Sequence, residues 1–223
     1  MKYDHWRRGM LLGFLLLEMA LYGLILTSGG YTLVISSYAS IVLCFVYSLT
    51  HIERENWLIP AGLFCTAGAD FFLVVCSPIR QLEGMLCFLA AQGLYALWLH
   101  RHGGGKGLLF LRLAAMLCAL AGVLLVLGKN TDALALVSLC YYANLIVNLA
   151  VSFTRFRERR LLSIAFVLFL LCDTVIGLQM ANGVYLSIPE GSVIDKILCV
   201  DFNLAWFFYL PSQVMIALSS KRK

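Results

Sequence analysis

The chain has 223 residues, of which 61% are hydrophobic and 13% charged, with a mean hydropathy of +0.88 and a net charge of +5. A soluble domain is about 45–50% apolar and about one quarter charged, so this composition excludes a chain that buries its apolar surface within itself in water. The apolar stretches are continuous runs of about 20 residues rather than short alternating segments, and they predict an all-α integral membrane protein.

Eight apolar runs, bounded by charged residues or by Gly, Pro and Asn clusters, predict transmembrane helices. They cover residues 10–27, 31–49, 57–76, 82–99, 107–127, 132–153, 161–180 and 198–218. Because eight helices of about 20 residues use about 160 residues, only short loops and tails are left. We therefore predict a single transmembrane domain over residues 1–223. No small-residue cleavage site follows the basic residues 1–8, which predicts an uncleaved first helix.

Basic residues gather on one side of the predicted bundle. Thirteen of the 17 Lys and Arg residues lie in the two tails and in the loops after the second, fourth and sixth predicted helices. These thirteen are Lys2, Arg7, Arg8, Arg54, Arg101, Lys106, Arg155, Arg157, Arg159, Arg160, Lys221, Arg222 and Lys223. The opposite loops carry Arg80, Lys129 and Lys196, and Arg112 lies in the first turns of the fifth predicted helix. The positive-inside rule then places both termini in the cytoplasm, and the net charge is a topology signal rather than a nucleic-acid footprint.

Two aspartates lie inside predicted spans, where an ionisable side chain is costly unless it faces the protein interior. Asp70 is near the outer end of the third predicted helix and Asp173 near the outer end of the seventh. Both helices run outward from the cytoplasm, so we expect the two carboxylates at nearly the same depth. Two carboxylates at one level suit acid–base chemistry, since burial and crowding can separate their pKa values. The alternative is a structural pair, hydrogen-bonded to neighbouring helices.

Other polar side chains recur three or four residues apart, which places each set on one helix face. The sets are Glu18 with Tyr22, Gln92 with Tyr95, Tyr141 with Asn144 and Asn148, and Tyr209 with Gln213. We expect these faces to line one shared, partly hydrated cavity, and interhelical hydrogen bonds without a cavity are the alternative. Asp201 and Asn203 are expected to open the last helix.

Several catalytic patterns are missing from the sequence. There is no Gly-x-Ser-x-Gly motif of a serine hydrolase. The four histidines, His5, His51, His100 and His102, lie in the predicted cytoplasmic tail or loops, so we expect no metal site within the membrane. The eight cysteines contain no Cys-x-x-Cys pair, which argues against a zinc site or a disulfide framework. We expect no metal and no cofactor.

The segments that carry the polar residues follow a definite order along the third to eighth predicted helices. They are residues 67–74, 83–85 with 88–95, 169–178 and 209–219. Together they resemble the YhhN family of lysoplasmalogenase-like membrane proteins. The resemblance implies a multi-pass enzyme that hydrolyses the vinyl-ether bond of lysoplasmalogens, releasing a fatty aldehyde and a glycerophosphoethanolamine or glycerophosphocholine. It also implies that Asp70 and Asp173 are the two aspartates of the family.

Vinyl-ether cleavage suits these residues, because it begins with protonation of an alkene carbon and needs an acid, a nearby anion and a water molecule. We predict that one of Asp70 and Asp173 is the general acid and that the other stabilises the cation and orients water. The predicted substrate-binding residues, which bind the glycerophosphate or position water, are Gln92, Tyr95, Asn144, Tyr209 and Gln213.

The predicted partner is a lysophospholipid in the bilayer, with no nucleic acid, and the predicted location is the plasma membrane of a bacterium. The competing interpretation is a non-enzymatic small transporter or lipid-binding membrane protein that uses the same aspartates for proton relay or packing. Release of aldehyde separates the two, because a transporter forms no product.

Overall fold

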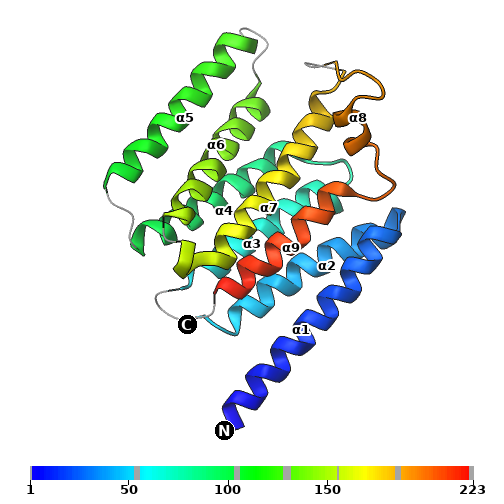
Figure 1. Cartoon of the computed structure of the whole chain (residues 1–223), viewed down its shortest axis with the longest axis vertical. Helices are drawn as coiled ribbons and strands as arrows, with labels where there is room; N and C mark the ends of the chain where they lie inside the picture. Colours follow the sequence, from blue (N-terminus) through cyan, green and yellow to red (C-terminus); the bar gives the residue numbers. More distant parts are fainter. Residues whose placement is uncertain are drawn as a thin grey trace.

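The structure is a computed structural model that describes residues 2–52, 56–102, 106–127, 132–154, 156–183 and 187–220 (Figure 1). The helices in chain order are α1 (Lys2–Thr27), α2 (Gly30–Leu49), α3 (Leu58–Asp70), the π-helical turn η1 (Phe71–Val75), α4 (Gln81–Arg101), α5 (Lys106–Leu127), α6 (Ala133–Phe153), α7 (Phe156–Ala181), α8 (Val193–Leu198) and α9 (Leu204–Ser219). Among the described residues, six helices are long and apolar enough to cross a membrane: α1, α2, α3 with η1, α4, α6 and α7. The predicted all-α membrane bundle is confirmed.

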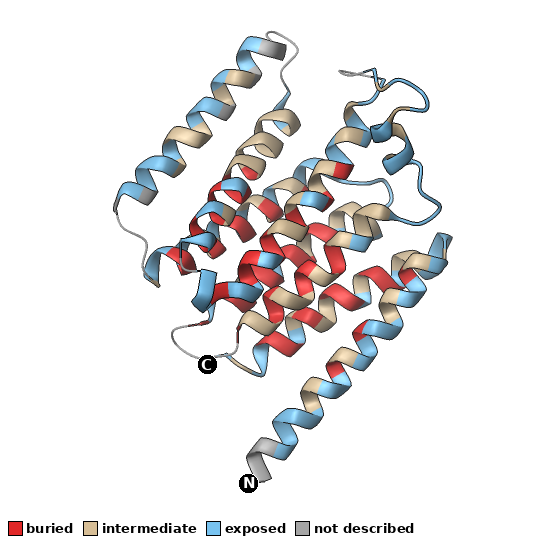
Figure 2. Ribbon diagram, viewed as in Figure 1, coloured by how far each residue is buried: buried red, intermediate tan, exposed pale blue. Residues whose placement is uncertain are grey.

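The long helices run alternately up and down, and both chain ends lie at the same end of the bundle (Figure 1). The central helices are α3, α4, α7 and α9, with α2 and α6 beside them, and their facing sides are buried (Figure 2). The two outer helices, α1 and α5, each pack mainly on one neighbour: α1 packs on α2, and α5 packs on α6. Both are exposed along most of their described length (Figure 2). The apolar surface that they expose suits a lipid surrounding rather than water.

The last predicted span, 198–218, is wrong at its beginning. The helix α9 starts at Leu204, and the separate short helix α8 ends at Leu198. The break is made by Asn203, whose Oδ1 accepts a hydrogen bond from the backbone N–H of Trp206 at 3.2 Å and so caps α9. Asp201 therefore lies before the helix instead of opening it. The shorter helix has 16 residues and spans about 24 Å.

The seventh predicted helix begins earlier than expected. The helix α7 starts at Phe156, within the basic segment predicted to be a loop, and Arg159 has non-helical backbone angles there. The Arg159 side chain is buried, lies over the Trp98 ring, and donates a hydrogen bond to the backbone carbonyl of His102. Arg155 is outside the described residues. This contact holds the end of α4 and the beginning of α7 together, so Arg159 is a packing residue in this structure.

Asp70 is the last residue of α3, and the helix widens into the π-helical turn η1 directly after it. The backbone N–H of Cys76 donates to the carbonyl of Phe71 at 3.0 Å, five residues earlier. Single π turns inside helices are rare and occur often at functional sites. Leu73, in this turn, packs so closely on Gly84 of α4 that a Cβ at position 84 would lie 2.8 Å from Leu73 Cδ2.

A close approach of α3 and α4 yields a stability test. A Cβ added at Gly62 would lie 2.7 Å from Cζ of the buried Tyr95 ring, whereas a Cβ added at Gly93 would meet no atom within 4 Å. We therefore expect Gly62→Ala to lower the free energy of unfolding by about 1–3 kcal/mol. Gly93→Ala should leave it unchanged or raise it by up to about 1 kcal/mol, because alanine favours the helix. Thermal unfolding in detergent measures both, and equal effects would contradict this packing.

Candidate functional site

The first half of the site is Asp70, which is 3% exposed. The hydroxyl of Tyr209 in α9 donates a hydrogen bond of 2.7 Å to Oδ2 of Asp70. The bond joins residues 139 positions apart in the chain, so it fixes α9 against the end of α3. A polar bond between spans is favourable here, since neither group can exchange it for one to lipid.

The second half of the site is Asp173, which is half-buried on α7. The hydroxyl of Tyr141 in α6 donates a hydrogen bond to its Oδ2. The next residue along each of the two helices also forms a hydrogen bond between α6 and α7, because the hydroxyls of Tyr142 and Thr174 lie 2.9 Å apart. Asp173 interacts electrostatically with Asp70, and the Cys172 thiol interacts with both carboxyl groups. The structure thus brings together the two aspartates that the sequence singled out.

Four aromatic rings form a cluster next to the two carboxyl groups. Its members are Phe88, Tyr141, Phe169 and Tyr209. The Phe169 ring centroid lies 5.4 Å from that of Tyr209 and 6.4 Å from that of Tyr141, so Phe169 bridges the two tyrosines that bind the aspartates. Phe88 makes the same bridge from α4, at 5.6 Å and 6.2 Å. All four rings are buried and most of their contacts are edge-to-face, so they form a packed aromatic cluster that holds the two tyrosines in place.

A second polar cluster, which we call the inner amide cluster, lies nearer the basic end of the bundle. It contains Gln92, Arg112, Asn144 and Asn148. The Arg112 guanidinium of α5 donates to Asn144 Oδ1, and to Asn148 Oδ1 at 2.8 Å. The Asn148 amide then donates to the backbone carbonyl and the side-chain oxygen of Gln92 in α4, at 2.9 and 2.8 Å. Three helices are joined by one chain of hydrogen bonds.

Among the described residues, Tyr95, Gln213 and Glu18 form no hydrogen bond with either aspartate. Tyr95 packs on the Phe166 ring at 5.9 Å between centroids. Gln213 is fully buried, and neither of its amide atoms has a hydrogen-bond partner among the described residues. Glu18 lies between α1 and α2, where it accepts from the Ser40 hydroxyl at 2.5 Å and from the Cys44 thiol at 3.3 Å. The hydrogen bonds of the described residues thus fall into several groups, and the shared cavity stays a prediction.

Two residues of these clusters, Tyr141 and Arg112, are not among the site residues predicted from the sequence. Tyr141 was noted only for its spacing from Asn144, although a tyrosine inside a span can supply the donor that a buried aspartate requires. Arg112 was counted as a topology charge. Its signal was present, because an ionisable residue six positions into an apolar helix is a candidate for function by the same rule that selected the aspartates. Within the described residues, no group of three or more His, Cys, Asp and Glu could hold a metal ion.

The fold and these clusters define a multi-pass helical membrane protein with two carboxyl groups, each bound by a tyrosine of another helix. Residues 31–220 match the model of the YhhN family, and the chain belongs to that family. The match leaves out all of α1, and it covers Asp70, Asp173 and the polar residues that contact them. No curated protein and no solved structure matches the chain.

The bond between Tyr209 and Asp70 can be tested by removing one oxygen atom. Tyr209→Phe keeps the ring in the aromatic cluster but leaves Asp70 without its donor, so we expect the free energy of unfolding to fall by about 1–3 kcal/mol. Tyr31→Phe is the control, because Tyr31 is 89% exposed and should change stability by less than about 0.5 kcal/mol. Thermal unfolding in detergent compares them, and equal stability of the two variants would show that the hydrogen bond is not maintained.

Proposed function

We propose that the protein is a hydrolase of the lysoplasmalogenase type, which cleaves the vinyl-ether bond of a single-chain phospholipid in the cell membrane. Membership of the YhhN family supports this proposal. The observation that carries it is the pair of carboxyl groups, Asp70 and Asp173, each bound by a tyrosine and both next to aromatic rings. We assign substrate binding to Gln92, Asn144 and Tyr209, and water positioning to Tyr95 and Gln213.

The reaction needs one proton donor and one anion. A protonated carboxyl group gives its proton to the alkene carbon remote from the ether oxygen, and the carbon bonded to that oxygen becomes an oxocarbenium ion. Water adds to this carbon and returns a proton to the carboxylate, forming a hemiacetal. The hemiacetal hydroxyl then loses its proton and its oxygen forms the aldehyde C=O, while the bond to the glycerol oxygen breaks and that oxygen takes up a proton. No proton is consumed overall.

The surroundings of the two aspartates suit these steps. In each carboxyl group the hydrogen bond from tyrosine engages Oδ2, and no hydrogen bond to either Oδ1 is present in the described part of the chain. Oδ1 can therefore face the substrate or the water. The Phe88 and Phe169 rings lie beside both tyrosines, and aromatic rings near the reacting carbon attract the positive charge of an oxocarbenium ion. The second carboxylate adds attraction that is strong in a medium of low dielectric constant.

The first test is the release of aldehyde by the purified protein in detergent. We expect Asp70→Asn and Asp173→Asn each to lower kcat by at least about a hundredfold, because an amide can neither donate the proton nor stabilise the cation as a carboxylate does. Asp132→Asn is the matched control. Asp132 is an exposed N-cap of α6, and asparagine caps a helix equally well, so activity should be unchanged.

Folding of each variant is checked by thermal unfolding before its rate is compared. Wild-type activity in folded Asp70→Asn or Asp173→Asn protein would overturn the two-carboxylate mechanism. Absence of aldehyde from the folded wild-type protein, with both ethanolamine and choline head groups, would favour a lipid-binding or transport function instead.

A further inference from the structure

Arg112 is a charged residue of the membrane-embedded part that the proposed reaction does not use. It lies six residues after the start of α5, about 9 Å along the helix axis. An arginine at this position could extend its side chain toward the interface, but its guanidinium group instead turns to α6 and binds the side chains of Asn144 and Asn148. Both acceptors are neutral amide oxygens. In the described part of the chain no carboxylate forms an ion pair with Arg112, so its charge is not neutralised there.

The hydrogen bonds around Arg112 leave several N–H donors without an acceptor among the described residues. A guanidinium has five N–H donors, and Asn144 and Asn148 account for two of them. Because the Asn148 side-chain oxygen accepts from Arg112, the Asn148 amide N–H group is turned to Gln92 and donates to its side-chain oxygen. Gln92 is 0% exposed, and its Nε2 atom has no partner among the described residues. The Asn148 amide thus links the Arg112 cation to the unsatisfied donor of Gln92. Such a combination of positive charge and a free N–H donor is typical of an anion-binding site.

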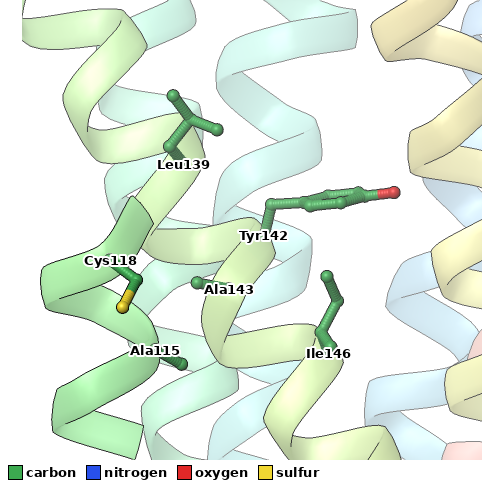
Figure 3. Close-up of a pocket in the computed structure, with 6 residues that line it drawn as sticks. All are labelled: Ala115, Cys118, Leu139, Tyr142, Ala143 and Ile146. Carbon is green, nitrogen blue, oxygen red and sulfur yellow. The ribbon is translucent and has the colours of Figure 1, made fainter. Parts of the chain in front are cut away.

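An apolar groove lies near this position on the side of the bundle, although Arg112 itself does not line it. A groove of about 340 Å³ lies between α5 and α6, and it is lined by Ala115, Cys118, Leu139, Tyr142, Ala143 and Ile146 (Figure 3). Ala115 is one helical turn from Arg112, and Ala143 precedes Asn144. Tyr142 extends away from α5 and does not close the groove (Figure 3). The apolar lining and the outer position of α5 favour an amphiphile from the bilayer over an ion from water (Figure 1).

We propose that Arg112, held by Asn144 and Asn148 and assisted by Gln92, binds the phosphate group of a single-chain phospholipid that enters between α5 and α6. This inference rests on the proposed function and assigns a specificity-determining residue to it.

The spacing along α6 suits this assignment. Tyr141, which binds Asp173, precedes Asn144 by three residues and Asn148 by seven, so Arg112 is bound about 4.5–10.5 Å from Tyr141 along the helix axis. In a lysoplasmalogen four single bonds of about 1.5 Å join the phosphate-linked oxygen to the ether oxygen through glycerol, and an extended chain of this kind reaches about 5 Å. A phosphate on Arg112 therefore leaves the vinyl ether within reach of the aspartates.

The kinetic test compares two substrates in two variants. Wild type, Arg112→Gln and Arg112→Lys are given an alkenyl glycerophosphoethanolamine and the corresponding alkenylglycerol, which lacks the phosphate. We expect Arg112→Gln to raise KM for the phospholipid by about 10- to 100-fold with little change in kcat, because the phosphate takes no part in the reaction. For the alkenylglycerol the rise should be at least tenfold smaller. The KM of Arg112→Lys for the phospholipid should lie between those of wild type and Arg112→Gln, because lysine keeps the charge.

Arg160→Gln is the matched control for kinetics, since Arg160 is an exposed arginine on the same side of the bundle. It should change KM by less than twofold for both substrates. An equal loss on both substrates in folded Arg112→Gln protein would overturn the proposal, because that result assigns Arg112 to packing alone.

A binding measurement separates this inference from the proposed function. An alkyl-ether glycerophosphoethanolamine, which cannot be hydrolysed by this route, should raise the Tm of the wild type in proportion to the logarithm of its concentration. This shift should be lost in Arg112→Gln, kept in Arg160→Gln, and absent with millimolar inorganic phosphate. If it depends on Arg112 but no aldehyde is released, the proposed reaction fails and the phosphate site stands. An equal shift in Arg112→Gln, or a shift with inorganic phosphate alone, would refute the lipid-phosphate site.

Discussion

A polar group inside a bilayer has to find its partner within the protein, because the hydrocarbon offers none. In this chain the partners are on other helices. Tyr209 joins α9 to α3, Tyr141 joins α6 to α7, and Asn148 joins α6 to α4. The residues that form the candidate site are therefore also the residues that hold the central helices in position. A loss of activity at any of them has meaning only beside a measurement of folding.

The helix α6 sets the distance between the two polar clusters. One of its faces carries Tyr141, which binds a carboxyl group, and the same face carries Asn144 and Asn148, which bind a guanidinium. The separation is physically useful, since a guanidinium close to a developing oxocarbenium ion would oppose its formation through Coulomb repulsion. One or two helical turns keep the charges apart, while a phosphate on the guanidinium would neutralise it. Aromatic rings, which attract cations without carrying charge, occupy the place beside the carboxyl groups.

The sequence predicted the features that depend on composition and periodicity. These include the helical membrane fold, the approximate helix ranges, and the aspartates as the exceptional polar residues. It did not predict which helices would pair, because the bond from Tyr209 to Asp70 joins positions far apart in the chain and depends on tertiary packing. The start of α9 was misplaced because the capping side chain of Asn203 outweighs the apolar residues before it. Arg112 was assigned to topology, since charge counting near a helix end does not distinguish a side chain that faces a loop from one that faces a neighbouring span.

The π-helical turn after Asp70 ends the span, because Cys76 has extended backbone angles. A π turn holds one residue more than an α turn, so the side chains within it are rotated from the positions that a continuous α-helix would give them. Asp70 belongs to the α-helical part and is oriented by the buried face of α3, whereas Phe71 and Val75 are exposed. The segment 76–80 can therefore change in length or sequence without turning the carboxyl group, as long as the widened turn absorbs the difference. The exception is Leu73, whose contact with Gly84 ties the turn itself to α4.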